Sequence, residues 1–170
     1  WADLLDVADS ALAPRARAGS VLPLIVSWNL WSLRDPTTHA ASGKRSCLRT
    51  RLQKGYVVLL QETHWAADDK AVWEADLQGA KVLHSPAVQT QRGGTSGGVA
   101  IVLPADVRLD SSSVLLPGYA VEAYVSCQGT SLNLLSTYFP PARQTQTLAD
   151  LRDALDLAPS GGHPPTIVGD

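Results

Sequence analysis

The sequence predicts a single α/β domain, and two observations support this class. The 170 residues are 45% hydrophobic and 18% charged, which is enough apolar content for one substantial core and too little charge for a disordered or coiled-coil chain. Short apolar runs also alternate with segments whose leucines recur at helical spacing. We expect residues 1–20 to form an N-terminal extension and residues 21–170 to form the domain.

Strands and helices are expected to follow one another along the chain. Leu48 and Leu52 lie one helical turn apart, and Gly55 is placed to end their helix. Two apolar runs flank Gly129 with so short a link that mixed or antiparallel pairing is implied, because a parallel crossover needs a dozen or more residues. We predict helices at 44–54, 66–79 and 145–157, and strands at 24–26, 56–60, 81–85, 97–104, 119–129, 131–140 and 164–170.

Charge narrows the classes of partner. A formal net charge of −2 supplies no overall attraction for a polyanion, so nucleic acid would have to be held by a local basic patch or a bound cation. The predicted helix at 44–54 carries five basic residues. We expect them to form a solvated outer helix face rather than a set of contacts to phosphates.

The sequence predicts no metal or redox site at the cysteines and no segment that crosses a membrane. Cys47 and Cys127 have no paired spacing typical of a metal knuckle or redox motif, so we expect both to be reduced and structural. The apolar segment 21–26 is too short to cross a bilayer, and the first residues lack the pattern of a signal peptide. We therefore expect an intracellular protein with no membrane partner.

Four predicted strands finish on or near a polar residue that comes just after their apolar residues, namely Asn29, Glu62, Tyr138 and Asp170. Polar groups at strand ends can form a site without disturbing the core. A carboxylate such as Glu62, with an amide oxygen such as that of Asn29, suits a hard cation that keeps several waters and binds substrate phosphate. Each residue alone also has an ordinary explanation: a solvated strand end, a packed tyrosine or a frayed terminus. Together they point to phosphate chemistry.

Other features near these strand ends allow both a structural and a functional interpretation. His64 lies two residues after Glu62, which would place it on the same strand face, either in a substrate groove or solvated. Trp28 and Trp31 would pack beneath the rim of the site, or stack on a base or sugar. The glycines of "RGGTSGGVA" lack the Lys-Ser/Thr of a nucleotide-binding loop, so we expect a hairpin connection there.

The motifs, taken in order, resemble the endonuclease/exonuclease/phosphatase superfamily. They are "SWNLWSLR", "LLQETHW", "SGGVAIVLP", "LNLLSTYFPP" and "TIVGD". Within the superfamily, the chain is most similar to the endonuclease domain of non-LTR retrotransposons, which nicks target DNA to prime reverse transcription. The resemblance implies the N-terminal half to two-thirds of a four-layer α/β sandwich like that of deoxyribonuclease I, with two mixed or mostly antiparallel sheets flanked by helices.

The resemblance also implies phosphodiester cleavage with Mg²⁺ or Mn²⁺. Glu62 would be the principal metal ligand, and Asn29 would assist at the metal or phosphate. Tyr138 would donate a hydrogen bond to the scissile phosphate, and Asp170 would orient or deprotonate the attacking water. The implied partners are nucleic acid, with DNA preferred, and a fused or adjacent reverse transcriptase domain in a nuclear protein.

The sequence departs from the family pattern after its final "GD". The family has an Asn two residues beyond the Asp and, much further on, an Asp-His pair; the chain contains neither. Loss of one electrostatic contact of the kind that the His supplies typically costs about 10²–10³ in rate. We therefore expect an incomplete, poorly active fragment with exposed sheet edges and an exposed apolar face. The alternatives are a non-catalytic remnant or binding module of the same fold, or a superfamily enzyme that acts on RNA, an inositol phosphate or a phospholipid.

Overall fold

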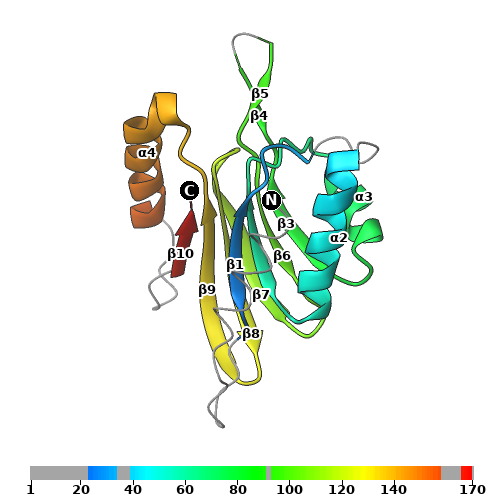
Figure 1. Cartoon of the computed structure of the whole chain (residues 1–170). Helices are drawn as coiled ribbons and strands as arrows, with labels where there is room; N and C mark the ends of the chain where they lie inside the picture. The colour runs from blue at the N-terminus through cyan, green and yellow to red at the C-terminus, as the bar shows by residue number, and fades with distance from the viewer. Residues whose placement is uncertain (1–22, 34–38, 91–92, 158–165, 170) are drawn as a thin grey trace, which may run out of the picture.

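The computed structural model describes residues 23–33, 39–90, 93–157 and 166–169. In this part of the chain, two four-stranded sheets and three α-helices form four layers (Figure 1). The order of strands is β1-β2-β6-β3 in the first sheet and β10-β9-β8-β7 in the second. This architecture confirms the predicted α/β sandwich of two mixed sheets flanked by helices.

The bounds of the elements are as follows. The first sheet contains β1 (Ile25–Asn29), β2 (Val57–Gln61), β6 (Val99–Leu103) and β3 (Lys81–Ser85). The second contains β10 (Thr166–Gly169), β9 (Thr130–Thr137), β8 (Ala120–Cys127) and β7 (Arg108–Leu116). A small hairpin is formed by β4 (Val88–Gln89) and β5 (Thr95–Ser96). The helices are α2 (His39–Gln53), α3 (Asp69–Asp76) and α4 (Gln144–Leu157), and a 3-10 turn (Pro141–Arg143) precedes α4.

Each sheet contains one parallel strand pair. In the first, β1 and β2 are parallel and α2 connects them; in the second, β9 and β10 are parallel and α4 connects them. Parallel neighbours need a long crossover, which a helix supplies. The two β-α-β units place their helices on opposite outer faces of the sandwich (Figure 1).

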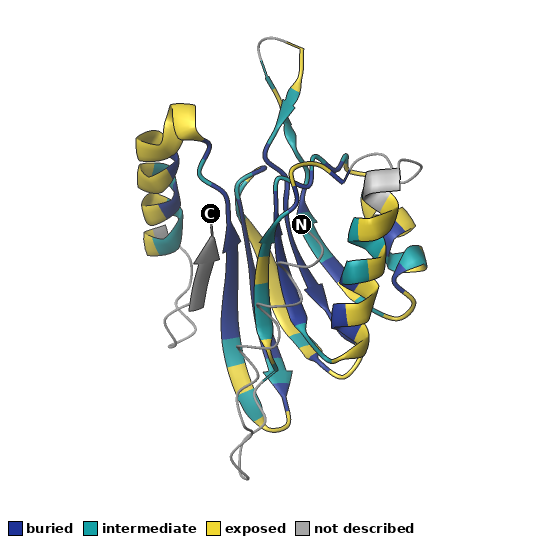
Figure 2. Ribbon diagram, in the orientation of Figure 1, coloured by how far each residue is buried: buried dark blue, intermediate teal, exposed yellow. Residues whose placement is uncertain are grey.

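The main core lies between the sheets. Leu59 of β2 and Ile101 of β6 belong to the same buried cluster as Ala123 of β8 and Leu134 of β9, and each is 0% exposed. Figure 2 shows the buried central strands in dark blue. Full burial of a leucine- or valine-sized side chain contributes about 1.5–3 kcal/mol, so this cluster holds the two sheets together.

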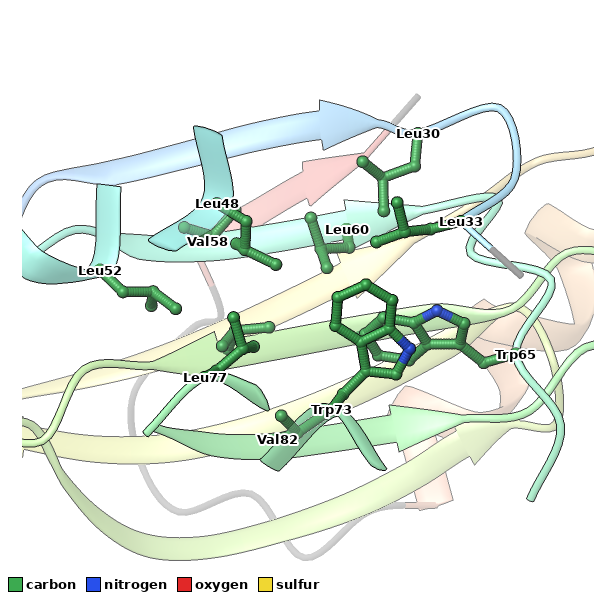
Figure 3. Packing of buried hydrophobic residues seen from close by; sticks show 12 residues of the cluster. Leu30, Leu33, Leu48, Leu52, Val58, Leu60, Trp65, Trp73, Leu77 and Val82 are labelled. Atoms are coloured by element: carbon green, nitrogen blue, oxygen red, sulfur yellow. The ribbon is translucent and has the colours of Figure 1, made fainter. Parts of the chain in front are cut away.

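A second core lies between the first sheet and its helices. Leu48 and Leu52 of α2 point into it, as their spacing predicts (Figure 3). Trp65 stacks on Trp73 of α3 with the ring centroids 5.0 Å apart. Trp73 is 3% exposed, which confirms its predicted place in the core. On the other outer face, Leu151 of α4 packs on the second sheet.

Several elements differ from those that the sequence predicts. The helix predicted from residue 44 begins at His39, and β7 was not predicted. Most of β7 is exposed, and its "DSSS" stretch has no alternating apolar pattern. It is a strand because its backbone pairs with β8. The glycine-rich segment forms the predicted hairpin, β4–β5, which projects from one end of the molecule (Figure 1).

Within the described residues, β1 and β3 are the edge strands of the first sheet, and β10 and β7 are those of the second; the expected exposure of sheet edges stays a prediction. Large apolar side chains that are exposed there lie on different parts of the chain rather than on one sheet face; they are Leu24, Trp31, Val72, Val114 and Leu148.

Both cysteines are free, as predicted. None of the helices in the described ranges is long and apolar enough to cross a membrane.

Candidate active site

The candidate site begins at the C-terminal ends of β1 and β2. Asn29 is paired with Gln61 in the parallel register, so Asn29 and Glu62 lie at the same edge of the first sheet. The loops that follow the two strands remain hydrogen-bonded to each other. Amide N–H groups of Leu30, Ser32 and Leu33 donate to the carbonyl oxygens of Gln61, Glu62 and Thr63, over 2.9, 2.8 and 3.1 Å respectively.

These loops concentrate unfavourable backbone geometry. Left-handed φ angles occur at Trp31 (48°), Ser32 (70°), Glu62 (50°) and His64 (56°). Such a conformation in a residue other than glycine costs on the order of 1–3 kcal/mol, and strain of this kind gathers at functional sites. The surrounding hydrogen bonds must hold the loops in place against it.

His64 is therefore not where the sequence placed it. The strand β2 ends at Gln61, and both Glu62 and His64 have left-handed backbone conformations, so they do not share a strand face. The ring Nδ1 of His64 lies 3.1 Å from the hydroxyl oxygen of Thr95 in β5. This contact ties the loop that carries Glu62 to the projecting hairpin.

The Glu62 side chain is half-buried, and the described part of the chain supplies no hydrogen-bond or ion-pair partner for its carboxylate. It belongs to no group of three or more His, Cys, Asp or Glu residues there. Mg²⁺ is commonly held by one or two carboxylates, with waters and substrate phosphate oxygens as its other ligands. One unpaired carboxylate at a strained strand end fits that mode of binding.

Asn29 shapes the loop that follows it. Its side-chain oxygen accepts a hydrogen bond from the N–H of Trp31 over 3.1 Å, in the manner of an Asx turn. The oxygen that the sequence suggests for a metal or phosphate thus also has a structural use. Its role at a metal stays a prediction.

Tyr138 follows the last residue of β9, in the second sheet. Its side chain is 9% exposed and belongs to the core between the sheets, while its N–H donates to the carbonyl of Tyr119 over 2.9 Å. The packing role that the sequence allows for Tyr138 is therefore present. The function of its hydroxyl at a phosphate stays a prediction.

A series of backbone contacts connects the Glu62 loop to Tyr138. The N–H of Thr63 donates to Gly98 over 3.0 Å, and the N–H of Gly98 donates to Gly118, next to Tyr119, over 2.8 Å. A Cβ atom on Gly98 would lie 2.5 Å from the Thr63 hydroxyl oxygen, and the φ of Gly98 is +85°. Glycine is required at position 98 because the segment before β6 approaches the loop after β2 so closely. The sequence predicts only a hairpin connection for these glycines, so this role was missed.

Buried polar side chains link the sheets directly beneath the site. Gln61, which is 0% exposed, accepts from the hydroxyl of Ser27 over 3.2 Å and donates to the hydroxyl oxygen of Ser136 over 3.4 Å. The Ser136 hydroxyl in turn donates to the carbonyl of Leu60 over 3.2 Å. Since Ser136 lies two residues before Tyr138, this network fixes the end of β9 against the end of β2.

Lys44 was wrongly assigned to a solvated basic face. Its Nζ donates to the carbonyl oxygens of Leu30 and Ser32 over 2.5 and 3.1 Å, so α2 braces the loop after β1. Arginines of the same helix also have protein partners. Arg45 and Arg49 pair with Asp76, and the Arg51 guanidinium lies 5.4 Å from the centroid of the Trp28 ring.

The two tryptophans in the first motif have different environments. Trp28 is half-buried and packs against the core of the first sheet, whereas Trp31 is 80% exposed. The predicted packing role therefore applies to Trp28.

Asp170 lies outside the described residues; Gly169, the residue before it in sequence, pairs with Thr137 of β9.

A cavity of about 490 Å³ lies at the other end of the first sheet. It is lined by the ends of α2 and α3 and by Pro104 and Ala105, which follow β6. Asp76, the acidic residue in its wall, is paired with two arginines. Asn29, Glu62 and Tyr138 do not line this cavity.

Comparison with known proteins decides the family. A model described as "Endonuclease/Exonuclease/phosphatase family" matches residues 26–169. The chain belongs to this family. The match spans the described strand ends from β1 to β10, and no curated protein sequence matches the chain.

Several solved structures share the fold. The AP endonuclease LMAP from Leishmania major is 18% identical with a TM-score of 0.58, and the match covers 86% of this chain and 54% of that one. The endonuclease domain of TRAS1, a telomere-specific non-LTR retrotransposon, is 16% identical with a TM-score of 0.55, covering 88% and 60%. A mannosyl-6-phosphatase from Bacteroides thetaiotaomicron is 13% identical with a TM-score of 0.58, covering 88% and 65%. The chain thus spans between about half and two-thirds of the length of these structures.

Proposed function

We propose that the protein is a divalent-metal-dependent endonuclease that cleaves phosphodiester bonds in DNA, of the type found in non-LTR retrotransposons. The observation that carries the proposal is the carboxylate of Glu62, which has no partner among the described residues and lies on a strained loop beside Asn29. The likeness to an AP endonuclease and to the TRAS1 endonuclease domain supports nucleic acid as the substrate. We further propose a fused or adjacent reverse transcriptase domain in the full reading frame, and a nuclear, intracellular location.

The residues at the strand ends would divide the chemistry among them. Glu62, assisted by Asn29, would hold Mg²⁺ or Mn²⁺. When bound, such a cation neutralises charge on the phosphate and lowers the pKa of a water molecule. The Tyr138 hydroxyl would donate to a non-bridging phosphate oxygen, and the Asp170 carboxylate would accept the proton of the attacking water.

Plasmid nicking tests the proposal. The full reading frame is incubated with supercoiled DNA in Mg²⁺, alongside Glu62→Gln and the control Asp153→Asn, which alters an exposed carboxylate on α4. We expect Glu62→Gln to lower the nicking rate by at least about 10²-fold, because one electrostatic contact to the transition state is worth about that much. The control should retain the wild-type rate.

Other outcomes would separate the alternatives. Glu62-dependent hydrolysis of a sugar phosphate without nicking would replace the endonuclease with a phosphatase, the activity named for the Bacteroides neighbour. Folded protein with neither activity would favour a non-catalytic remnant or binding module. In the same assay we expect residues 1–170 alone to nick DNA far more slowly than the full reading frame, because the transition state would have fewer positioned donors.

A further inference from the structure

The Trp31 side chain is exposed beside the candidate site. It is 80% exposed, whereas Trp65 and Trp73 are 0% and 3% exposed. A single exposed apolar side chain requires no explanation by itself. Trp31 is distinguished by the loop that keeps its indole in solvent.

That loop is rigidly braced in a strained conformation. Trp31 and Ser32 are consecutive left-handed residues, with φ angles of 48° and 70°. Leu30 and Leu33, on either side of them, are each 1% exposed and anchor the loop in the core. The Asn29 side chain and the Lys44 ammonium bond to the backbone of the same loop. Strain that is held so firmly indicates a conformation kept for function.

The loop is also hydrogen-bonded to the backbone of Glu62, the residue that carries the proposed catalytic carboxylate. Ser32, next to Trp31, donates its N–H to the carbonyl oxygen of Glu62 over 2.8 Å. A ligand whose phosphate reaches Glu62 would therefore have its neighbouring groups beside Trp31. The Lys44 ammonium is already bonded to the carbonyl oxygens of Leu30 and Ser32, so it is not a free cation for a phosphate beside Trp31.

We propose that Trp31 stacks on an unpaired or unstacked nucleobase next to the phosphate on which Glu62 acts. The inference rests on the proposed function. A neutral indole has no charge to attract phosphate, but its flat face matches that of any base. In an intact duplex, neighbouring bases cover those faces, so stacking needs a base that is single-stranded, flipped out or displaced. Trp31 thus makes the site prefer single-stranded or distorted DNA to regular duplex.

Binding measurements on the full reading frame test the preference. Fluorescence anisotropy with EDTA gives dissociation constants for a labelled single-stranded oligonucleotide and for its duplex. The variants are Trp31→Ala, Trp31→Phe and the control Val72→Ala, which removes an apolar side chain that is 54% exposed on α3. We expect Trp31→Ala to weaken single-strand binding roughly 10-fold and duplex binding less than about twofold, because one stacked base is lost.

Two further readouts separate stacking from a merely structural role. Trp31→Phe should restore most of the single-strand affinity because it retains an aromatic face. The salt dependence of binding should be the same for wild type and Trp31→Ala, since a neutral side chain releases no counterions. Unchanged affinity in Trp31→Ala, or an equal loss for both forms of DNA, would overturn the inference.

The nicking assay shows whether a negative result contradicts only the stacking role of Trp31 or also the proposed function. If wild-type protein nicks DNA in a Glu62-dependent way while Trp31→Ala keeps the same strand preference, only the role of Trp31 is wrong. If wild-type protein neither binds DNA nor nicks it, the proposed function is wrong and the inference falls with it.

Discussion

The two β-α-β units contribute to the candidate site in different ways. In the β1–α2–β2 unit, loop-to-loop hydrogen bonds, the Asn29 side chain and Lys44 hold strained residues in place beyond the strand ends. In the β9–α4–β10 unit, Tyr138 is positioned by burial of its ring and by a bond to Tyr119. The first unit forms its part of the site locally, whereas the second depends on how the two sheets pack. Changes where the units meet should therefore have the largest effects.

Gly98 links the loop after β2 to the turn at Gly118 and Tyr119, which in turn bonds to Tyr138, and its substitution should be the most disruptive. In Gly98→Ala, the new Cβ would lie 2.5 Å from the Thr63 hydroxyl oxygen and 3.0 Å from the backbone nitrogen of His64, at a φ of +85°. We expect the free energy of unfolding to fall by about 3 kcal/mol, from backbone strain and overpacking together. Urea denaturation of the full reading frame measures this.

Gly129 supplies the matched control for that substitution. It has a similar φ of +80°, but a Cβ there would meet no atom within 4 Å. Gly129→Ala should therefore cost only the backbone term, about 1 kcal/mol. Equal losses for the two variants would mean that the close approach of the loops at Gly98 does not hold the units together.

The sequence predicts the strand ends of this site well and its loops poorly. Apolar runs followed by Asn29, Glu62 and Tyr138 are visible in the sequence because burial sets the composition of a strand. The left-handed conformation of Glu62 is not visible, because it arises from tertiary hydrogen bonds to neighbouring loops. In the same way, β7 forms by backbone pairing and needs no apolar pattern.

The role of an individual basic residue could not be predicted from the sequence either. Lys44 looks like any solvated lysine on a helix, because its partners are backbone carbonyls far away in sequence. The double glycine at Gly97 and Gly98 was the one available signal for a close approach of loops, since consecutive glycines at a strand start often mark such contacts. The roles assigned to Asn29, Glu62, Tyr138 and Asp170 stay predictions.

Lys44 provides a smaller test, confined to the first unit. In Lys44→Met, the carbonyl oxygens of Leu30 and Ser32 lose their charged donor, while the stem of the side chain keeps its packing. We expect a loss of about 1.5–3 kcal/mol in the free energy of unfolding, because a hydrogen bond to a charged group contributes about that much. The nicking rate should fall several-fold, as the Glu62 loop loses part of its support.

The exposed Lys54, which follows α2, serves as the control for this change. Lys54→Met removes the same charge without removing a brace, so both stability and nicking should stay close to wild type. Limited proteolysis gives an independent readout, since cleavage within residues 30–33 should accelerate in Lys44→Met alone. Similar behaviour of the two variants would show that the bonds from Lys44 do not stabilise the loop.

Substitution of His84 should have the smallest effect, which is a change in how stability depends on pH. It lies on β3, where its Nε2 donates to the carbonyl of Ala66 over 3.2 Å and its ring meets the edge of Trp65. Burial lowers the pKa of His84 below its ordinary value of 6.5, against the opposing effect of the bond to Ala66; Lys70 lowers it further, while Asp69 and Glu74 raise it. The unfolded chain therefore takes up a proton at a higher pH than the folded one.

The sign of the pH dependence follows from that difference. Above the unfolded pKa, His84 is neutral in both states and has no effect on stability. As the pH falls through about 6.5, protonation favours the unfolded chain, so the free energy of unfolding should decrease until the folded-state pKa is also passed. Urea denaturation between about pH 8 and pH 5 should show a steeper acid-side decline for wild type than for His84→Gln, with parallel behaviour near pH 8. Identical slopes for the two proteins would contradict the burial of a neutral imidazole behind the Glu62 loop.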